Sequence, residues 1–412
     1  MKHLIPYVQS FSVPFEYPVY FTTDLFSPDN PALALAAARL HERRRHRFMI
    51  FVDSGVAAAH ENLTFRMREY FESRSADMRL AADPAVVPGG ESAKNGWEHV
   101  HDIIGAINRH RLDRQSYIVA VGGGAVLDMV GFAAALVHRG LRLLRVPTTT
   151  LAQNDAGIGV KNGINDQGQK NYIGTFAPPF AVLNDAAFLT TLTFEQWIGG
   201  ISEAFKVAII KDAAFFEFLV DAAAALRARD GAVMEEAVRR CAILHLDHIR
   251  NTGDPFEFGS ARPLDFGHWA AHKLESMSGF TMGHGQAVAV GIALDAYIAV
   301  RQGLMAEADF IRIVYGLQAC GLPVWEERLH RRAPDGSLEI LAGLAQFREH
   351  LGGDLMITLP NGIGGKVEVG AVEAEDVAAA IAVLRDCAGR TASAFGEITE
   401  APTRAGRRCG HV

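Results

Sequence analysis

Cysteine is scarce in this chain, and its spacing excludes two kinds of site. The 412 residues hold four cysteines, Cys241, Cys320, Cys387 and Cys409, and no two of them form a CxxC pair. This excludes a disulfide framework and a cysteine zinc site, and it is typical of the reducing cytoplasm. The N-terminus lacks the apolar core of a signal peptide, and no run approaches the roughly 18 apolar residues of a membrane span. We expect a cytoplasmic protein with no membrane partner.

An excess of positive charge is also lacking. The chain carries 40 Lys and Arg residues against 47 Asp and Glu residues, which gives a net charge of −7. Because no global positive field attracts phosphate backbones, we expect no nucleic-acid partner. Residues 41–47 are a local exception, rich in arginine, and are interpreted as the solvated end of a helix that begins near Pro31.

The composition that remains is that of a globular protein large enough for two domains. Hydrophobic residues make up 49% of the chain and charged residues 21%. In the first half, apolar runs at residues 48–52, 117–121 and 142–147 alternate with helical patterns and predict strands of a parallel sheet. A polar or glycine-rich turn follows each run. Because ligands bind beyond the carboxyl ends of such strands, these turns predict a nucleotide site.

The second half has a different pattern. Apolar residues recur at three- and four-residue intervals in residues 201–210, 215–227, 233–250 and 287–301, which predicts helices. We therefore expect an α/β domain over residues 1–190 and a helical domain over residues 191–388. Residues 389–412 lose this periodicity and are expected to form a flexible tail.

Three histidines are the most informative side chains of the second half. His268 and His272 are four residues apart and project from the same side of a helix, and His284 follows. Imidazole is a common ligand of zinc-like metals, so one cation or one anionic group could meet this cluster. Coincidence is the alternative, because the chain has 16 histidines.

Other polar groups lie where burial or glycine makes them unusual. Glu203 and Lys206 lie within an apolar helix. They are either an ordinary ion pair, or a metal ligand beside a residue that contacts substrate. The glycines of residues 122–128 follow a predicted strand and open a helix. They form either a plain turn or a pyrophosphate site. Residues 155–171 hold two lysines and three asparagines among glycines. This segment is either a solvated loop or a phosphate-binding loop.

Taken in order, eight motifs resemble the dehydroquinate synthase-like sugar phosphate cyclases. They are residues 53–55, 88–94, 122–128, 146–149, 169–174, 203–206, 267–272 and 284–288. The resemblance implies an N-terminal Rossmann-like NAD-binding α/β domain, a C-terminal helical metal-binding domain, and an active site in the cleft between them. It also implies a homodimer, because Arg139 matches an arginine that reaches the neighbouring subunit's site in this family.

The resemblance also assigns roles by position. The implied ligands of Zn2+, Co2+ or another divalent metal are Glu203, His268 and His284, while His272 becomes a phosphate contact. The implied catalytic residues are Lys206, His272, Asp155 and Lys161. The implied NAD contacts are Asp53, Glu91, Lys94, Gly123, Gly124, Asp128, Thr148, Thr149, Lys170 and Thr191. The implied substrate contacts are Lys161, Asn171, Arg139, Asp265, Arg262 and His350.

The family chemistry suits these residue types. NAD takes a hydride from a secondary alcohol whose oxygen the metal polarises, and phosphate then leaves by elimination. The hydride is returned, and an intramolecular aldol step closes a carbocycle, so the net reaction is a lyase-type cyclisation without overall redox change.

Departures from dehydroquinate synthase proper concern the substrate. A lysine and an asparagine that help to bind a substrate carboxylate are replaced by His245 and Asp265, and the distal phosphate-binding lysine is missing near residues 348–353. That region resembles the valiolone-type cyclases, which use sedoheptulose 7-phosphate. We expect a neutral ketose phosphate as substrate, because Asp265 would repel a carboxylate but accept hydrogen bonds from hydroxyls. The alternatives are 3-dehydroquinate synthase and, more remotely, a glycerol dehydrogenase-like oxidoreductase.

Overall fold

A computed structural model describes residues 6–251, 256, 263–350 and 355–389. The chain divides into two compact units. The first unit comprises Met1–Val146 and Val160–Asn184, and the second comprises Pro147–Gly159 and Asp185–Val412. The segment expected to form a flexible tail lies outside the described residues, apart from Gly389.

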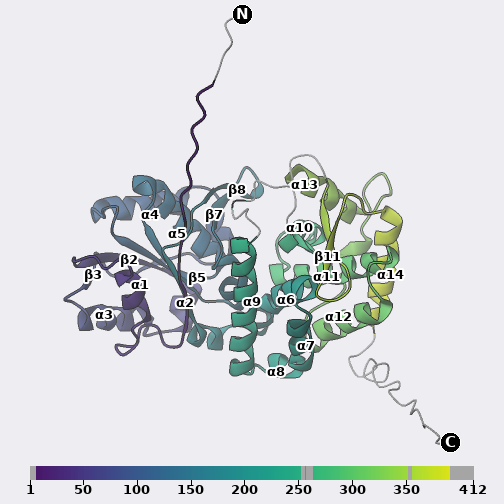
Figure 1. Cartoon of the computed structure of the whole chain (residues 1–412), viewed down its shortest axis with the longest axis horizontal. Helices are drawn as coiled ribbons and strands as arrows, with labels where there is room; N and C mark the ends of the chain where they lie inside the picture. The colour runs from purple at the N-terminus through teal and green to yellow at the C-terminus, as the bar shows by residue number, and fades with distance from the viewer. Residues whose placement is uncertain (1–5, 252–255, 257–262, 351–354, 390–412) are drawn as a thin grey trace, which may run out of the picture. The chain divides into compact units, whose positions relative to one another are not determined.

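A mainly parallel sheet forms the centre of the first unit (Figure 1). Its strands run in the order β1-β9-β6-β5-β2-β3, and β4 also pairs with β2. The bounds are β1 Val19–Thr22, β2 His46–Asp53, β3 Met78–Leu80, β4 Ala85–Val87, β5 Tyr117–Gly122, β6 Arg142–Pro147 and β9 Ala181–Asp185. Every residue of β5 is buried, as expected for a central strand covered on both faces. The three predicted strands are confirmed as β2, β5 and β6.

Helices and a hairpin complete the first unit. The helices are α1 Ala32–Ala38, α2 Ser54–Ala59, α3 Leu63–Ser73, α4 Glu98–Arg109 and α5 Gly124–Leu136, with the 3-10 turns η1 Glu91–Lys94 and η2 Val137–Arg139. β7 Lys161–Asp166 pairs antiparallel with β8 Gln169–Phe176. The polar segment predicted to be a loop is therefore largely a hairpin.

The prediction for residues 41–47 was wrong. Helix α1 ends at Ala38, and His46 and Arg47 are the first residues of β2. The signal was misleading because β2 begins with two charged or polar side chains. Arg47 donates hydrogen bonds to the carbonyls of His110 and Arg111, which explains why it can begin a buried strand.

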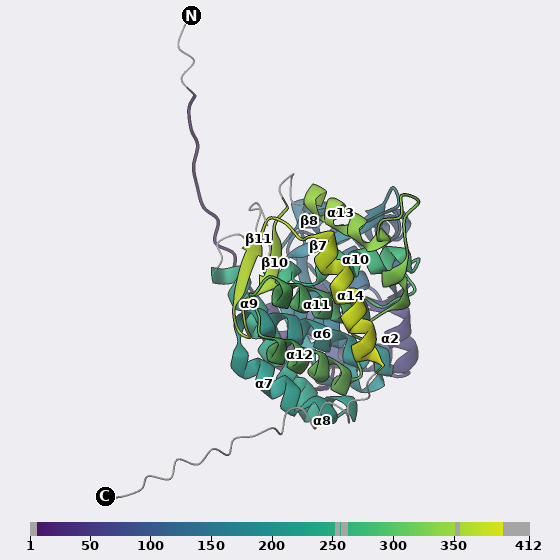
Figure 2. The same ribbon diagram turned by 90° about the vertical axis from the view of Figure 1, so that its right-hand side faces the viewer.

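The second unit is mainly helical (Figure 2). Its helices are α6 Phe194–Lys211, α7 Ala213–Asp221, α8 Ala223–Arg227, α9 Gly231–Asn251, α10 His268–Met277, α11 His284–Arg301, α12 Glu307–Cys320, α13 Ala342–His350 and α14 Ala374–Ala388. Four 3-10 turns, η4 Ala186–Thr191, η5 Pro263–Asp265, η6 Glu327–His330 and η7 Glu339–Leu341, and the π-helix η3 Ala152–Ala156 connect them. An antiparallel pair, β10 Ile357–Pro360 and β11 Lys366–Val369, was not predicted. The expected fold class, a parallel α/β unit followed by a helical unit, is confirmed.

Glycines let α6, α10 and α11 approach one another closely. A Cβ atom on Gly285 would lie 2.1 Å from the carbonyl oxygen of Gly199, and one on Gly291 would lie 2.0 Å from that of Gly267. Gly267 also has a φ of +79°, which favours glycine. Because α11 touches α6 through one glycine pair and α10 through the other, the N-terminal residues of α10 and α11 lie near the middle of α6.

We expect Gly285→Ala to destabilise the protein by about 1–3 kcal/mol, because its methyl group would overlap the backbone of α6. The matched control is Gly199→Ala, since a Cβ there meets nothing within 4 Å. The control should be neutral or stabilise by up to about 1 kcal/mol, as alanine favours helix interiors. Denaturant unfolding of both variants measures this, and equal midpoints would contradict the close approach.

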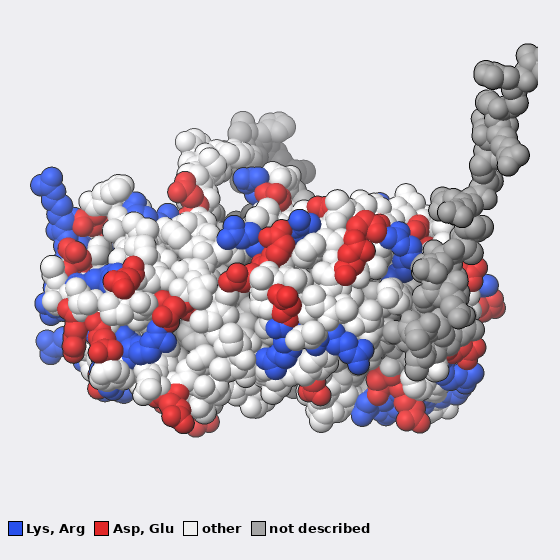
Figure 3. Space-filling model, turned by 90° about the horizontal axis from the view of Figure 1, so that it is seen from below, with Lys and Arg blue, Asp and Glu red and all other residues white. Residues whose placement is uncertain are grey.

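Two surface properties bear on the sequence expectations. Among the described residues, no helix has the length and apolarity that crossing a membrane requires. On the face drawn in Figure 3, acidic and basic side chains are interspersed. The absence of a nucleic-acid partner stays a prediction.

Candidate functional site

Helix α6 carries a buried carboxylate and a buried amine. Its first turn is closed by a capping box between Thr193 and Gln196, and every residue from Trp197 to Ile210 is buried. Glu203 is 1% exposed and Lys206 is 2% exposed, and the two form an ion pair one turn apart. A charge is costly to bury, so this pair and its surroundings require a reason beyond packing.

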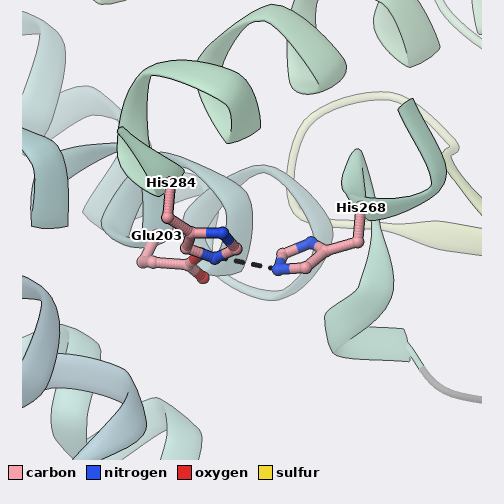
Figure 4. Close-up of side chains that lie close together, drawn as sticks. All are labelled: Glu203, His268 and His284. Atoms are coloured by element: carbon pink, nitrogen blue, oxygen red, sulfur yellow. Dashed lines mark ion pairs between the residues drawn. The ribbon is translucent and has the colours of Figure 1, made fainter. Parts of the chain in front are cut away.

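Two histidines meet Glu203 from the first residues of two other helices (Figure 4). Nε2 of His268 and Nε2 of His284 each lie 3.6 Å from Oε1 of Glu203. The positions follow from the fold, because each histidine stands directly after the glycine that precedes its helix. Glu203, His268 and His284 form a group whose ligand atoms all lie within 4.8 Å of one another.

The geometry fits a divalent cation. Bonds of about 2.1 Å in a tetrahedral arrangement leave ligand atoms about 3.4 Å apart, close to the spacing seen here. Oε1 of Glu203 is buried without a hydrogen-bond partner of normal geometry, while Oε2 is paired with the ammonium of Lys206. One carboxylate and two imidazoles suit zinc, cobalt or iron.

The pKa values of Glu203 and His268 agree with this fit. Burial raises the pKa of Glu203, but the Lys206 ammonium and His284 outweigh it and lower it to about 2, so the carboxylate is ionised. Burial and the nearby Lys206 hold the pKa of His268 well below its usual range. A neutral His268 that donates its Nδ1 proton to the carbonyl of Phe266, 3.1 Å away, presents the Nε2 lone pair to a metal. Burial lowers the pKa of His284, but its hydrogen bonds to Glu203 and Glu275 outweigh burial and raise it to about 9, so a metal would displace a proton from Nε2.

His272 lies beside these groups but differs from them. It is exposed on α10, with its ring centroid 5.4 Å from that of His268 and 6.0 Å from that of His284. It belongs to a second group that could hold a cation, with Glu275 and His284. The structure thus brings all three predicted histidines together, and His272 is not part of the group that contains Glu203.

A second polar cluster adjoins the amine of Lys206. The π-helix η3 presents Asp155, whose Oδ1 lies 2.9 Å from Nδ1 of His245 on α9. Burial opposes the charge of Lys206, but the carboxylates of Glu203, Asp155 and Asp265 outweigh it and raise the pKa of the amine. Asp155 and Asp265, both predicted from the sequence, are therefore close enough to act on Lys206.

Several positions assigned to NAD lie together in the first unit. Nζ of Lys94 donates to Oδ2 of Asp128, 2.7 Å away, and to the amide oxygen of Asn171. Glu91 lies 4.0 Å from Lys170. Asp53 caps α2, and Gly123 precedes α5, which has no side-chain cap. The uncapped amides at the start of α5 are suited to an anion, and a pyrophosphate there stays a prediction.

The remaining predicted residues are more scattered. In the second unit, Thr148 is buried with a hydroxyl that lacks a hydrogen-bond partner, Thr149 accepts from the amide of Ala152, and Thr191 is exposed at the end of η4. In the first unit, Lys161 and Arg139 are exposed, and Arg139 has a φ of +62°. Arg262 lies outside the described residues, as does the side chain of His350, at the end of α13.

Sequence reasoning missed two buried carboxylates near the histidines. Glu275 on α10 lies 3.3 Å from Nδ1 of His284. Asp295 accepts hydrogen bonds from the amide of Gly267 and from the indole of Trp269, at 2.9 and 2.8 Å. These donors flank His268. A lone aspartate in the apolar run of residues 287–300 was the signal that could have found Asp295.

Asp295 should make stability depend on pH. Burial raises its pKa to about 7, against the two hydrogen bonds that lower it, while the unfolded value is near 3.8. The folded state therefore binds the proton more tightly. This stabilisation is complete below about pH 4 and is lost as pH rises through 7, by about 4 kcal/mol at most.

The measurement is the free energy of unfolding between pH 4 and 8 for the wild type and for Asp295→Asn. The difference between them should shift in favour of the variant as pH rises. Asp386→Asn, an exposed position, is the control and should give a constant difference. A constant difference for Asp295→Asn as well would contradict the raised pKa.

Comparisons with known proteins identify the family of this chain. Residues 84–199 match the family described as 3-dehydroquinate synthase N-terminal, and residues 200–340 match 3-dehydroquinate synthase C-terminal. The 3-dehydroquinate synthase of Ruegeria sp. (strain TM1040) is 33% identical over 350 residues, which cover 84% of this chain and 90% of that protein. The chain belongs to the 3-dehydroquinate synthase family, and it is an enzyme of the dehydroquinate synthase-like cyclases, carbon–oxygen lyases that act on phosphates.

Two solved structures are similar along most of the chain. The 2-epi-5-epi-valiolone synthase of Streptomyces hygroscopicus subsp. jinggangensis 5008, solved with NAD+ and Zn2+ bound, is 30% identical, with a TM-score of 0.81 over 92% of this chain and 99% of that one. A 2-deoxy-scyllo-inosose synthase, solved with carbaglucose-6-phosphate, NAD+ and Co2+, is 24% identical, with a TM-score of 0.71 over 89% of this chain and 96% of that one. The second likeness shows the fold alone.

Proposed function

We propose that this enzyme cyclises a neutral ketose phosphate, sedoheptulose 7-phosphate, to a valiolone-type cyclitol with the help of NAD and zinc. The observation that supports this proposal is the negative charge around Lys206. Two carboxylates, Asp155 and Asp265, act on this amine in addition to Glu203. The position that holds a lysine in dehydroquinate synthases is His245, and it is paired with Asp155.

These charges favour a substrate with hydroxyl groups over one with a carboxylate. A substrate carboxylate would meet two ionised carboxylates, and at a distance of about 4 Å each repulsion costs from about 1 to about 4 kcal/mol, depending on the local dielectric. Hydroxyl groups of a sugar donate hydrogen bonds to the same carboxylates. The likeness to 2-epi-5-epi-valiolone synthase supports the same substrate class.

The residues divide the work by their chemistry. When bound, NAD supplies a hydride acceptor and the divalent cation supplies a Lewis acid. Glu203, His268 and His284 would hold the cation, and Nζ of Lys206 would orient a substrate hydroxyl. His272, exposed beside them, would hold the departing phosphate. Lys161 and Asn171, and Arg139 of a homodimer partner, would complete the substrate contacts in a cytoplasmic enzyme.

The rest of the proposed cofactor site consists of positions that match the family motifs. Asp53, Gly123, Gly124 and Asp128 would bind NAD around the start of α5. Glu91, Lys94, Lys170, Thr148, Thr149 and Thr191 complete that set. His350 and Arg262 remain proposed substrate contacts.

The test is phosphate release from purified enzyme with NAD and zinc, compared between two substrates. We expect release from sedoheptulose 7-phosphate without accumulation of reduced NAD. Release from the deoxy-heptulosonate phosphate alone would overturn the proposal in favour of 3-dehydroquinate synthase, the activity named for the Ruegeria relative. Accumulation of reduced NAD from glycerol without phosphate release would instead indicate a glycerol dehydrogenase-like oxidoreductase.

We expect Asp265→Asn to narrow the preference between the two substrates. Removing one carboxylate lowers the repulsion of a substrate carboxylate by about 1.4 kcal/mol or more, so the ratio of kcat/KM should move toward the deoxy-heptulosonate phosphate by about tenfold or more. Asp247→Asn, which removes a carboxylate on α9 that is paired with Arg250, is the control. An unchanged ratio in Asp265→Asn would remove this residue from substrate selection.

A further inference from the structure

Glu275 is a buried carboxylate with no place in the proposed reaction. It lies in the last turn of α10 and is 4% exposed. Its Oε2 is 3.3 Å from Nδ1 of His284, while Nε2 of the same ring faces Glu203. The imidazole of His284 therefore lies between two carboxylates, one on each nitrogen.

We propose that Glu275 is a positioning residue that orients His284 for metal binding. A carboxylate accepts hydrogen bonds only, so Nδ1 of His284 must donate. Because Nδ1 keeps its proton, Nε2 is the ring nitrogen left to bind a metal, and it faces Glu203. The inference rests on the proposed metal site, but not on the identity of the sugar phosphate.

The two histidines are held differently. Nδ1 of His268 faces a neutral backbone carbonyl, that of Phe266, at 3.1 Å. Nδ1 of His284 faces an ionisable carboxylate, which makes the opposite nitrogen a more basic ligand. Glu275 belongs to α10, which also carries His268, and His284 begins α11. The contact therefore holds His284 in place relative to the helix that carries His268.

The same side chains could hold a separate cation, since His272, Glu275 and His284 also form a compact group. Nδ1 of His284 cannot both donate a proton to Glu275 and coordinate a metal. Burial of Glu275 and its 3.3 Å contact with Nδ1 of His284 favour the hydrogen bond, while His272 is exposed.

The test measures zinc affinity by competition with a chelator, on the full-length protein stripped of metal. Glu275→Ala should weaken zinc binding by about 10- to 100-fold, the usual effect of losing such a partner. Glu275→Gln keeps an acceptor oxygen and should lose less. The matched control is Glu339→Ala. It removes a carboxylate whose Oε1 lies 3.8 Å from Nζ of Lys273, on the same helix as Glu275, and leaves His284 untouched.

Cobalt-loaded protein gives a second readout that a general loss of stability would not produce. The visible absorption of Co2+ should shift in Glu275→Ala and stay unchanged in Glu339→Ala. Zinc affinity of Glu275→Ala and Glu275→Gln within twofold of the wild type would overturn the inference. So would binding of two zinc equivalents by the wild type, with loss of the second one alone in Glu275→Ala. If zinc affinity falls as expected while sedoheptulose 7-phosphate is not turned over, the proposed substrate fails and the role of Glu275 stands.

Discussion

His284→Ala is expected to abolish stoichiometric zinc binding, whereas His272→Ala is expected to retain it. Nε2 of His284 is one of three atoms around the proposed cation, at 3.6 Å from Oε1 of Glu203. With two protein ligands left, the site keeps too few bonds for tight binding. His272 lies outside the group that contains Glu203, so its loss should lower turnover and leave the metal in place.

Zinc content after gel filtration measures this difference, together with activity. The wild type and His272→Ala should each hold about one equivalent, and His284→Ala about none. The reverse outcome, loss of metal in His272→Ala with retention in His284→Ala, would place the cation elsewhere. Circular dichroism of both metal-free variants checks that each is folded.

Much of this site could be anticipated because its residues stand in motifs that follow glycines. Gly267 and Gly283 each precede a histidine, and the motif around Glu203 is short and local. What the sequence could not give is the spacing of the three groups, since Glu203 and His284 are brought together by the contact of Gly285 with Gly199. Such a contact depends on helix packing, which has no local signal.

Glu275 and Asp295 were missed for a related reason. Each is a single carboxylate on a helix, and its partner lies on another helix. In the sequence, nothing around Glu275, three residues after His272, distinguishes it from a surface glutamate. Burial distinguishes a positioning carboxylate from a solvated one, and burial follows from tertiary structure.

The fold class was easier to predict than its details. Buried strands such as β5 are continuous apolar runs, which the sequence displays directly. The hairpin β7–β8 was missed because β8 is mostly exposed and polar, so that no apolar alternation marks it. The start of β2 was misassigned because its first two residues, His46 and Arg47, are polar or charged, as at the solvated end of a helix. Arg47 can begin a strand because it donates hydrogen bonds to backbone carbonyls.

Lys206→Met is expected to have the second large effect, on both stability and activity. The amine is paired with Glu203 and also acts on Asp155, which leaves buried carboxylates without their cation when it is removed. Breaking one side of such a buried pair costs about 3–5 kcal/mol. Turnover should fall by about 10²- to 10⁴-fold if Nζ also acts on a substrate hydroxyl.

Zinc separates these two effects. The Lys206 ammonium is a cause of the low pKa of Glu203, so the pKa of this carboxyl rises when the ammonium is removed. A bound cation supplies the missing positive charge beside Glu203. Added zinc should therefore restore much of the lost free energy of unfolding in Lys206→Met, but none of the lost turnover.

Lys211→Met, at the end of the same helix, is the control and should change neither property by much. Thermal unfolding with and without zinc, and phosphate release at saturating zinc, give the two readouts. Stability of metal-free Lys206→Met equal to that of the wild type would mean that Glu203 is protonated in the variant at little cost. Recovery of turnover with zinc would mean that Lys206 acts only on Glu203, and that the substrate is oriented by other groups.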